Sequence, residues 1–314
     1  MSVPPSPEGS GSERRTAMAV LLVMPLFFCS NIIFGRAIAG QVEPFTLAFI
    51  RWSLTALILM PFVWPQISRA RHMIAGFGRQ LALLGFLGMW VCGALVYLAL
   101  EYTTATNGTL IYTSSPVLII LIEYLFRGRK VGFREAAGVS IALFGVVTII
   151  VKGSLDVLLS LTFNLGDLIF VGAAIAWAVY SVLLKADNLM PLQTLPLFML
   201  IAAAGAVLLL PFALVEALWL QEFPTTTHAW MNISGIVVFA SLLAFSAFQF
   251  GVRVIGPSLT GIFMYLLPVY GVSLAIIFLG EELATYHMWG VLLVLSGVVL
   301  ATWPKRALRE IKRV

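Results

Sequence analysis

Arg51 is the residue whose type and position most clearly suggest chemistry. It lies about two turns into an apolar run at 45–65, where a charged side chain is costly and marks a functional candidate. Two interpretations remain open. The planar guanidinium can pair with a substrate carboxylate, or the side chain can extend toward the nearby helix end to reach polar surroundings.

Glu123 is a second charged residue at the edge of an apolar run. Arg127 follows it by four positions, a spacing that places two side chains next to each other on a helix. The spacing predicts a local ion pair. The alternative is a carboxylate that carries a proton.

Aromatic and amide residues form two matched stripes. Trp90, Tyr97 and Glu101 follow one helical face, and the positions 152 residues later hold Leu242, Gln249 and Arg253. Deep polar and aromatic side chains predict either a substrate cavity or ordinary packing. The residues predicted to line such a cavity are Asn31, Arg51, Trp90, Tyr97, Tyr112, Trp177, Tyr180, Gln249 and Tyr265.

Two prolines, Pro116 and Pro268, fall in the middle of apolar runs at equivalent positions. Proline removes a backbone hydrogen bond and can kink a helix. The pair predicts either helices that bend as a cavity opens or static packing.

The elements that position these residues are membrane-spanning helices. Hydrophobic residues make up 61% of the 314 positions and charged residues 11%, against about 25% charged residues in soluble domains. The apolar runs are about 20 residues long and continuous, which suits helices crossing a bilayer and not the alternating strands of an outer-membrane barrel. The predicted helices are 16–36, 45–65, 80–100, 106–126, 134–151, 166–186, 193–215, 231–251, 257–279 and 285–303.

The basic residues predict the orientation of these helices. With the N-terminus inside, 16 of the 19 Lys and Arg residues fall in inside segments and two fall outside. Positive charge favours the cytoplasmic side. We therefore expect a multi-pass protein of the cytoplasmic membrane with both termini in the cytoplasm. The net charge of +5 lies in short loops, which excludes a nucleic-acid partner and leaves the lipid bilayer and a small-molecule substrate.

An internal repeat divides the chain. Residues 116–147 align without a gap to 268–299, with nine identical pairs that include Pro116/Pro268 and Gly138/Gly290. Five helices per half is an odd number, so the halves must be inverted, as in many secondary transporters. The predicted fold is all-α, with ten transmembrane helices as two inverted five-helix repeats around a central cavity. The predicted parts are a disordered tail (1–15), the repeats (16–151 and 166–303), an external linker (152–165) and a basic tail (304–314).

Patterns typical of enzymes are absent from the sequence. There is no phosphate-binding loop, no metal-ligand spacing and no nucleophile with a base. Cys29 and Cys92 lie inside apolar runs and are predicted to be core residues. No cofactor and no metal site are expected.

Several motifs resemble the drug/metabolite transporter superfamily, specifically its ten-helix EamA-type members. The motifs are Ser30-Asn31 through Arg36, Pro44 followed by Arg51, Ala99-Leu100 through Ala105, Thr109 and Pro116, Gly280-Glu281-Glu282, and Gly297-Val298-Val299. The resemblance covers about 16–303 and is nearest to amino-acid exporters of the YddG type.

The resemblance implies a basket-like fold, alternating access and export of amino acids or related small metabolites. The four-helix drug exporters of the superfamily carry a carboxylate in the first helix, and this chain has none there. The sugar-phosphate transporters carry several buried cations, whereas Arg51 is the one candidate for a buried cation here. The alternatives are export of another metabolite or drug, or a non-transporting membrane receptor or scaffold. A monomer is expected.

Overall fold

The computed structural model describes residues 11–38, 40–162, 164–186, 189, 191–220, 223–279 and 284–303. The C-terminal tail, residues 1–10 and the Gly280-Glu281-Glu282 motif lie outside these ranges. Within them, ten helical segments are long and apolar enough to cross a membrane, which confirms the predicted all-α membrane fold. The described elements are α1 (Gly11–Ala37), α2 (Pro44–Ala75), α3 (Gly78–Gly85), η1 (Phe86–Leu95), α4 (Val96–Tyr102), α5 (Ala105–Tyr112), α6 (Ser115–Arg127), α7 (Phe133–Ile150), α8 (Leu155–Leu159), α9 (Leu165–Leu183), α10 (Thr194–Trp219), α11 (Thr227–Gly235), η3 (Ile236–Leu243), α12 (Ala244–Ile255), α13 (Pro257–Ile262), η4 (Phe263–Leu266), α14 (Leu267–Leu279) and α15 (Thr285–Thr302).

Some boundaries differ from the prediction. Helix α1 begins at Gly11, so residues 11–15 are helical and do not belong to a disordered tail. Helix α2 continues to Ala75, about ten residues past the predicted end. The segment predicted as a linker contains the short helix α8, whose Leu155 and Leu159 are exposed.

Four of the ten spans are interrupted. The third and eighth spans contain the π-helical segments η1 and η3, and the fourth breaks between α5 and α6. The ninth passes through the 3-10 turn η4. Pro116 and Pro268 lie within the fourth and ninth spans, which run from Asn107 to Arg127 and from Pro257 to Leu274. Pro116 is the second residue of α6 and Pro268 the second residue of α14, so each follows directly the point where the helix type changes. A proline donates no backbone hydrogen bond, which fits a change of helix type at these points.

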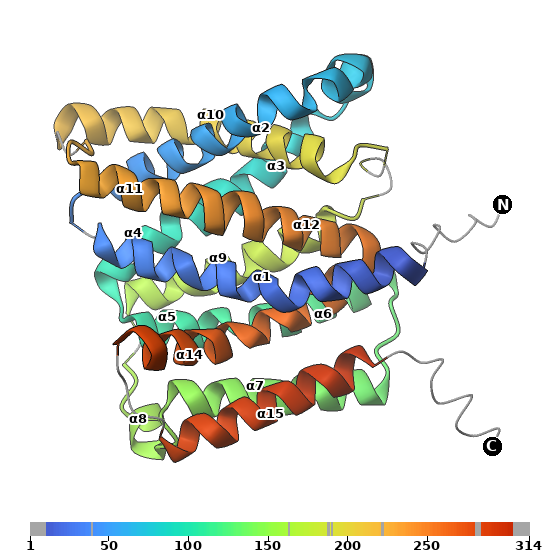
Figure 1. Ribbon diagram of the computed structural model, residues 1–314, viewed down its shortest axis with the longest axis vertical. Helices are drawn as coiled ribbons and strands as arrows, with labels where there is room; N and C mark the ends of the chain where they lie inside the picture. Colours follow the sequence, from blue (N-terminus) through green and yellow to red (C-terminus); the bar gives the residue numbers. More distant parts are fainter. Residues whose placement is uncertain are drawn as a thin grey trace.

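The helices form layers (Figure 1). The pair α2 and α10 covers one side of the bundle, the pair α7 and α15 covers the opposite side, and α1, α9 and α12 lie between them. Helix α1 begins and α15 ends at one end of the bundle, which we call the termini side. Helix α8 lies at the other end, which we call the linker side.

The contact between α7 and α15 shows how the two halves are related by symmetry. A Cβ atom on Gly138 would lie 2.6 Å from the carbonyl oxygen of Gly297, and one on Gly145 would lie 2.8 Å from that of Gly290. Gly138 and Gly290 are repeat equivalents, and so are Gly145 and Gly297. Gly138 therefore contacts the repeat equivalent of Gly145, and Gly145 contacts the repeat equivalent of Gly138. A two-fold axis between the halves produces such reciprocal contacts. Small residues allow this close approach of backbones.

A carboxylate ties the halves together at the linker side. Helix α2 begins with Pro44 and leaves backbone N–H groups without helical partners. Glu216, on α10, accepts hydrogen bonds from the N–H groups of Phe45 (3.1 Å) and Thr46 (2.7 Å) and from the Thr46 hydroxyl (2.8 Å). A negative charge at a helix N-terminus also stabilises the helix dipole.

Candidate functional site

Arg51 lies in the interior, where both halves of the protein supply its partners. The side chain is 4% exposed. Its Nε donates to Ser241 Oγ (2.7 Å) and its Nη2 to the Ala240 carbonyl (3.3 Å), both in η3. Its Nη1 donates to Asn31 Oδ1 (3.3 Å) on α1 and to Tyr97 Oη (3.0 Å) on α4. We call Arg51, Asn31, Tyr97 and Ser241 the arginine cluster.

This placement rules out extension of Arg51 toward a helix end. The guanidinium is held inside the bundle, 4.5 Å from the centre of the Trp52 ring. Its hydrogen-bond acceptors are neutral, and no salt bridge to Arg51 occurs among the residues that the structure describes. A buried charge without an opposite charge is costly. The arginine cluster is therefore suited to receive an anionic group.

A second polar group lies nearer the termini side. Gln249 is 4% exposed and Tyr180 is fully buried. The Gln249 Nε2 donates to Tyr180 Oη at 3.0 Å, while Gln249 Oε1 is buried with no hydrogen-bond partner in the described structure. An unpaired buried acceptor costs about 1–3 kcal/mol. This carboxamide oxygen can accept a hydrogen bond from a ligand.

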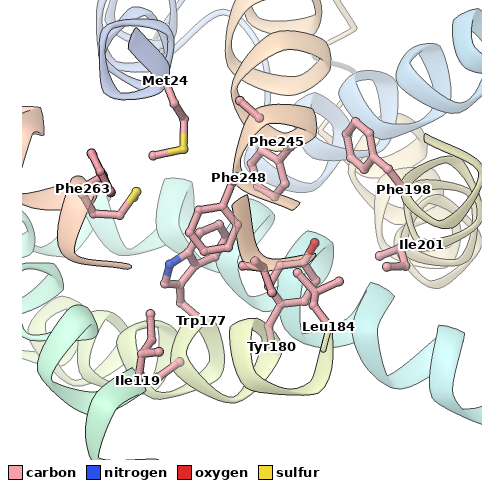
Figure 2. Packing of buried hydrophobic residues seen from close by; sticks show 14 of the residues in the cluster. Met24, Ile119, Trp177, Tyr180, Leu184, Phe198, Ile201, Phe245, Phe248 and Phe263 are labelled. Atoms are coloured by element: carbon pink, nitrogen blue, oxygen red, sulfur yellow. The ribbon is translucent and has the colours of Figure 1, made fainter. Parts of the chain in front are cut away.

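Aromatic side chains link the two groups, from Trp52 beside the Arg51 guanidinium to Tyr180, the partner of Gln249. Figure 2 shows Phe198, Phe245, Trp177 and Tyr180 of this set. The Phe245 ring stands 4.8 Å from Trp52, 6.0 Å from Phe198 and 5.5 Å from Trp177. Trp177 in turn stacks on Tyr180 at 5.5 Å. The Nε1 atoms of Trp52 and Trp177 are buried without described partners. The interior therefore offers apolar walls with a few unpaired polar atoms, as ligand sites do.

The two polar groups are equivalents under the internal repeat. Tyr97 corresponds to Gln249 at the offset of 152. In the earlier, more loosely matched part of the repeat, residues 28–36 parallel residues 177–185, which pairs Asn31 with Tyr180. Tyr97 donates to Asn31 Oδ1 at 2.8 Å, just as Gln249 donates to Tyr180. Arg51 has no counterpart, because Pro44 parallels Pro191 and the position seven residues later in the second half is Phe198. The cation therefore makes the two groups chemically different.

The remaining predicted residues lie elsewhere in the bundle. Tyr265 is buried, and its hydroxyl has no described partner. Tyr112 is half-buried, with its ring 6.5 Å from Trp177. Trp90 does not join either polar group, because its ring packs with those of Phe45, Phe86 and Phe212.

The predicted ion pair between Glu123 and Arg127 is wrong. Glu123 is buried and lies 3.6 Å from Arg129, while Arg127 is exposed. Both the N–H and the hydroxyl of Ser258 donate to the Glu123 carboxylate. The turn after α6 and the N-terminus of α13 bring these groups together, which spacing along one helix cannot reveal.

Sequence reasoning missed Ser241, Trp52 and Phe245. Ser241 was hidden because small hydroxyl residues are common in membrane helices and bond to their own backbone. Trp52 follows Arg51 directly, and only the packing of α2 against η3 and α12 places it beside the guanidinium. No group of three or more His, Cys, Asp or Glu side chains suited to a metal occurs in the described part of the chain.

Ten membrane-spanning helices in two inverted halves, with a buried cation between them, define a helical membrane transporter. The chain belongs to the EamA-like transporter family, whose model matches residues 15–151 and 164–303. Family and relatives are transporters and not enzymes, as the sequence predicted.

The relatives span nearly the whole chain. An uncharacterized transporter of Archaeoglobus fulgidus is 29% identical over 295 residues, covering 92% of this chain and 97% of that protein. A probable amino-acid metabolite efflux pump of Escherichia coli is 23% identical, covering 95% and 98%. A solved crystal structure at 18% identity superposes with a TM-score of 0.73 over 91% of this chain and 97% of the other, a likeness that shows the fold.

Proposed function

We propose that this protein exports amino acids or closely related zwitterions across the cytoplasmic membrane by alternating access, with Arg51 binding the substrate carboxylate. The observation that carries the proposal is the arginine cluster. A buried guanidinium is held by neutral acceptors from both halves, with no acidic partner among the described residues. A carboxylate offers that fork two parallel, charge-assisted hydrogen bonds, which are stronger than neutral ones.

Carboxylate binding also supplies a reason for movement. Arg51 and its partners Asn31 and Tyr97 belong to the first half, while Ser241 belongs to the second. A carboxylate that displaces one of these acceptors changes the contacts between the halves. A ligand that binds one arrangement more tightly than the other shifts the equilibrium toward it.

The Gln249–Tyr180 pair acts at a different step. Arg51 lies seven residues from the linker-side start of α2, or about 10 Å. Gln249 lies six residues from the termini-side end of α12, or about 9 Å. Phe245 lies between them, because its ring centre is 5.7 Å from the Arg51 guanidinium carbon and Gln249 follows it by one turn of α12 toward the termini side. The ammonium and carboxylate of an α-amino acid share one carbon, so one substrate meets the two groups in sequence.

The name of the Escherichia coli relative, a probable amino-acid metabolite efflux pump, agrees with this substrate class. The proposed orientation places both termini in the cytoplasm, and the proposed working unit is a monomer. Substrate then passes from the Gln249–Tyr180 pair, past the aromatic rings, to the arginine cluster.

Flux measurements on purified protein in liposomes test the proposal. A panel of labelled amino acids is compared with the corresponding amides, which lack the carboxylate. We expect flux of amino acids, and a loss of at least about 10-fold in Arg51→Gln, the size of one charge-assisted hydrogen bond. Arg69→Gln is the matched control, because Arg69 is an exposed arginine on the same helix.

Two results would contradict the proposal. The absence of flux for every amino acid in the panel, with folded wild-type protein, would favour a receptor or an exporter of other compounds. Equal flux in Arg51→Gln and Arg69→Gln would remove the carboxylate role from Arg51.

A further inference from the structure

Glu101 and Arg253 extend the two matched stripes to opposite ends of the protein. Glu101 lies one helical turn beyond Tyr97, and Arg253 one turn beyond Gln249, each on the same face as the interior residue. The repeat offset of 152 residues relates Glu101 to Arg253. Because the halves are inverted, Glu101 falls on the linker side and Arg253 on the termini side.

Glu101 lines a pocket on the linker side. The pocket has a volume of about 410 Å³, and its wall includes Thr103, Asn107 and Asn164. The buried Asp167 fixes this wall, because it accepts hydrogen bonds from the Thr103 hydroxyl (2.6 Å), the Asn107 amide (3.4 Å) and the Asn164 N–H (2.9 Å). Among the described residues that line the pocket there is no lysine or arginine. Its size suits a small molecule, and its charge suits a cationic group.

Arg253 lies near the termini-side end of α12. It is half-buried, donates to the Leu192 carbonyl, and has Glu13 of α1 as a charged neighbour. Together with Gln249 and Thr194 it lines a cavity of about 10 Å³, which holds about one water molecule. Gln249, whose Oε1 has no described partner, lines the same cavity. A guanidinium here is placed to meet a carboxylate before the substrate reaches Gln249.

We propose that the two ends of the transport path bind opposite charged groups of a zwitterionic substrate. Arg253 binds the substrate carboxylate on the termini side, and Glu101 binds the ammonium group in the pocket on the linker side. This inference rests on the proposed function, and it adds a separate binding site at each membrane face. The described structure holds the larger cavity at the Glu101 end, about 410 Å³ against about 10 Å³ at the Arg253 end.

Oriented membrane vesicles provide the test, with half-saturation concentrations measured from each side. Arg253→Gln is expected to raise the value about 10-fold for amino acids presented on the termini side, and Glu101→Gln about 10-fold for those on the linker side. The opposite side of each variant stays unchanged. Arg127→Gln and Asp156→Asn are the controls, since both residues are exposed and lie on the corresponding sides.

Substrate analogues used as competitors sharpen the test. An amino-acid amide lacks the carboxylate, so its inhibition from the termini side is expected to be the same for Arg253→Gln and wild type. An N-acetyl amino acid lacks the ammonium group and is expected to be insensitive to Glu101→Gln. Thermal melting of each variant checks that it is folded.

The outcomes separate this inference from the proposed function. The inference is overturned if neither variant changes the half-saturation concentration on one side only. It is also overturned if a variant changes inhibition by the analogue that lacks the relevant charged group. In both cases amino-acid flux through the wild type leaves the proposed export function in place. If the wild-type protein transports no amino acid, both the inference and the proposed function are overturned.

Discussion

Gln249 donates a 3.0 Å hydrogen bond to Tyr180, and its carboxamide oxygen remains buried without a partner among the described residues. The equivalent pair in the first half, Tyr97 and Asn31, instead shares both of its oxygens with Arg51. One pair is satisfied by a cation, and the other has an acceptor to spare. The same scaffold therefore presents different chemistry toward its two ends.

Replacing Gln249 by Leu is expected to lower amino-acid flux by about 10-fold while leaving the protein folded. The substitution removes the buried, unpaired Oε1, but it also removes the hydrogen bond from Nε2 to the Tyr180 hydroxyl, so the two effects on stability offset each other. Flux and melting temperature are measured for Gln249→Leu and Tyr180→Phe, separately and combined. A fall in melting temperature with unchanged flux would assign the pair a purely structural role.

Arg51→Lys keeps the charge and loses the planar fork. Because lysine cannot form two parallel hydrogen bonds to a carboxylate, we expect the half-saturation concentration for amino acids to rise about 10-fold. Transport kinetics of Arg69→Lys provide the comparison. Unchanged kinetics at normal expression would speak against a carboxylate at Arg51.

Gly297→Ala is expected to destabilise the protein by about 1–3 kcal/mol, the usual cost of overpacking. A Cβ atom there would lie 2.4 Å from the backbone nitrogen of Ala142, so α7 and α15 would have to separate. Gly172→Ala is the control, because a Cβ on Gly172 of α9 meets nothing within 4 Å. Thermal unfolding in detergent compares the two, and equal melting temperatures would contradict the close contact between α7 and α15.

A cysteine at Arg71 is expected to react with a membrane-impermeant thiol reagent only from the cytoplasm, and a cysteine at Leu155 only from outside. Both native side chains are exposed. Labelling in intact cells and in inverted vesicles, in a background with Cys29 and Cys92 replaced by Ala, makes the measurement. Labelling of residue 71 in intact cells would falsify the orientation.

The sequence located the ten spans because each apolar run matches the bilayer thickness. It also singled out Arg51, Tyr97, Tyr180 and Gln249 as deep polar or aromatic residues, since such residues are rare in lipid. The π-helical segments and the break before α6 could not be predicted. Alternative hydrogen-bond patterns differ little in local sequence preference, and the packing of neighbouring helices selects among them.

The sequence alone determined the membrane-spanning class, the inverted halves and the residue types available for binding. Apolar length, charge placement and the repeat are properties of the chain itself. Only the tertiary structure decided which of those residues meet. Asn31, Arg51, Tyr97 and Ser241 come from four separate elements, and Glu123 bonds to Ser258 135 positions away instead of pairing with Arg127. Contacts between helices depend on how their faces rotate and cross, and no spacing along a single helix contains that information.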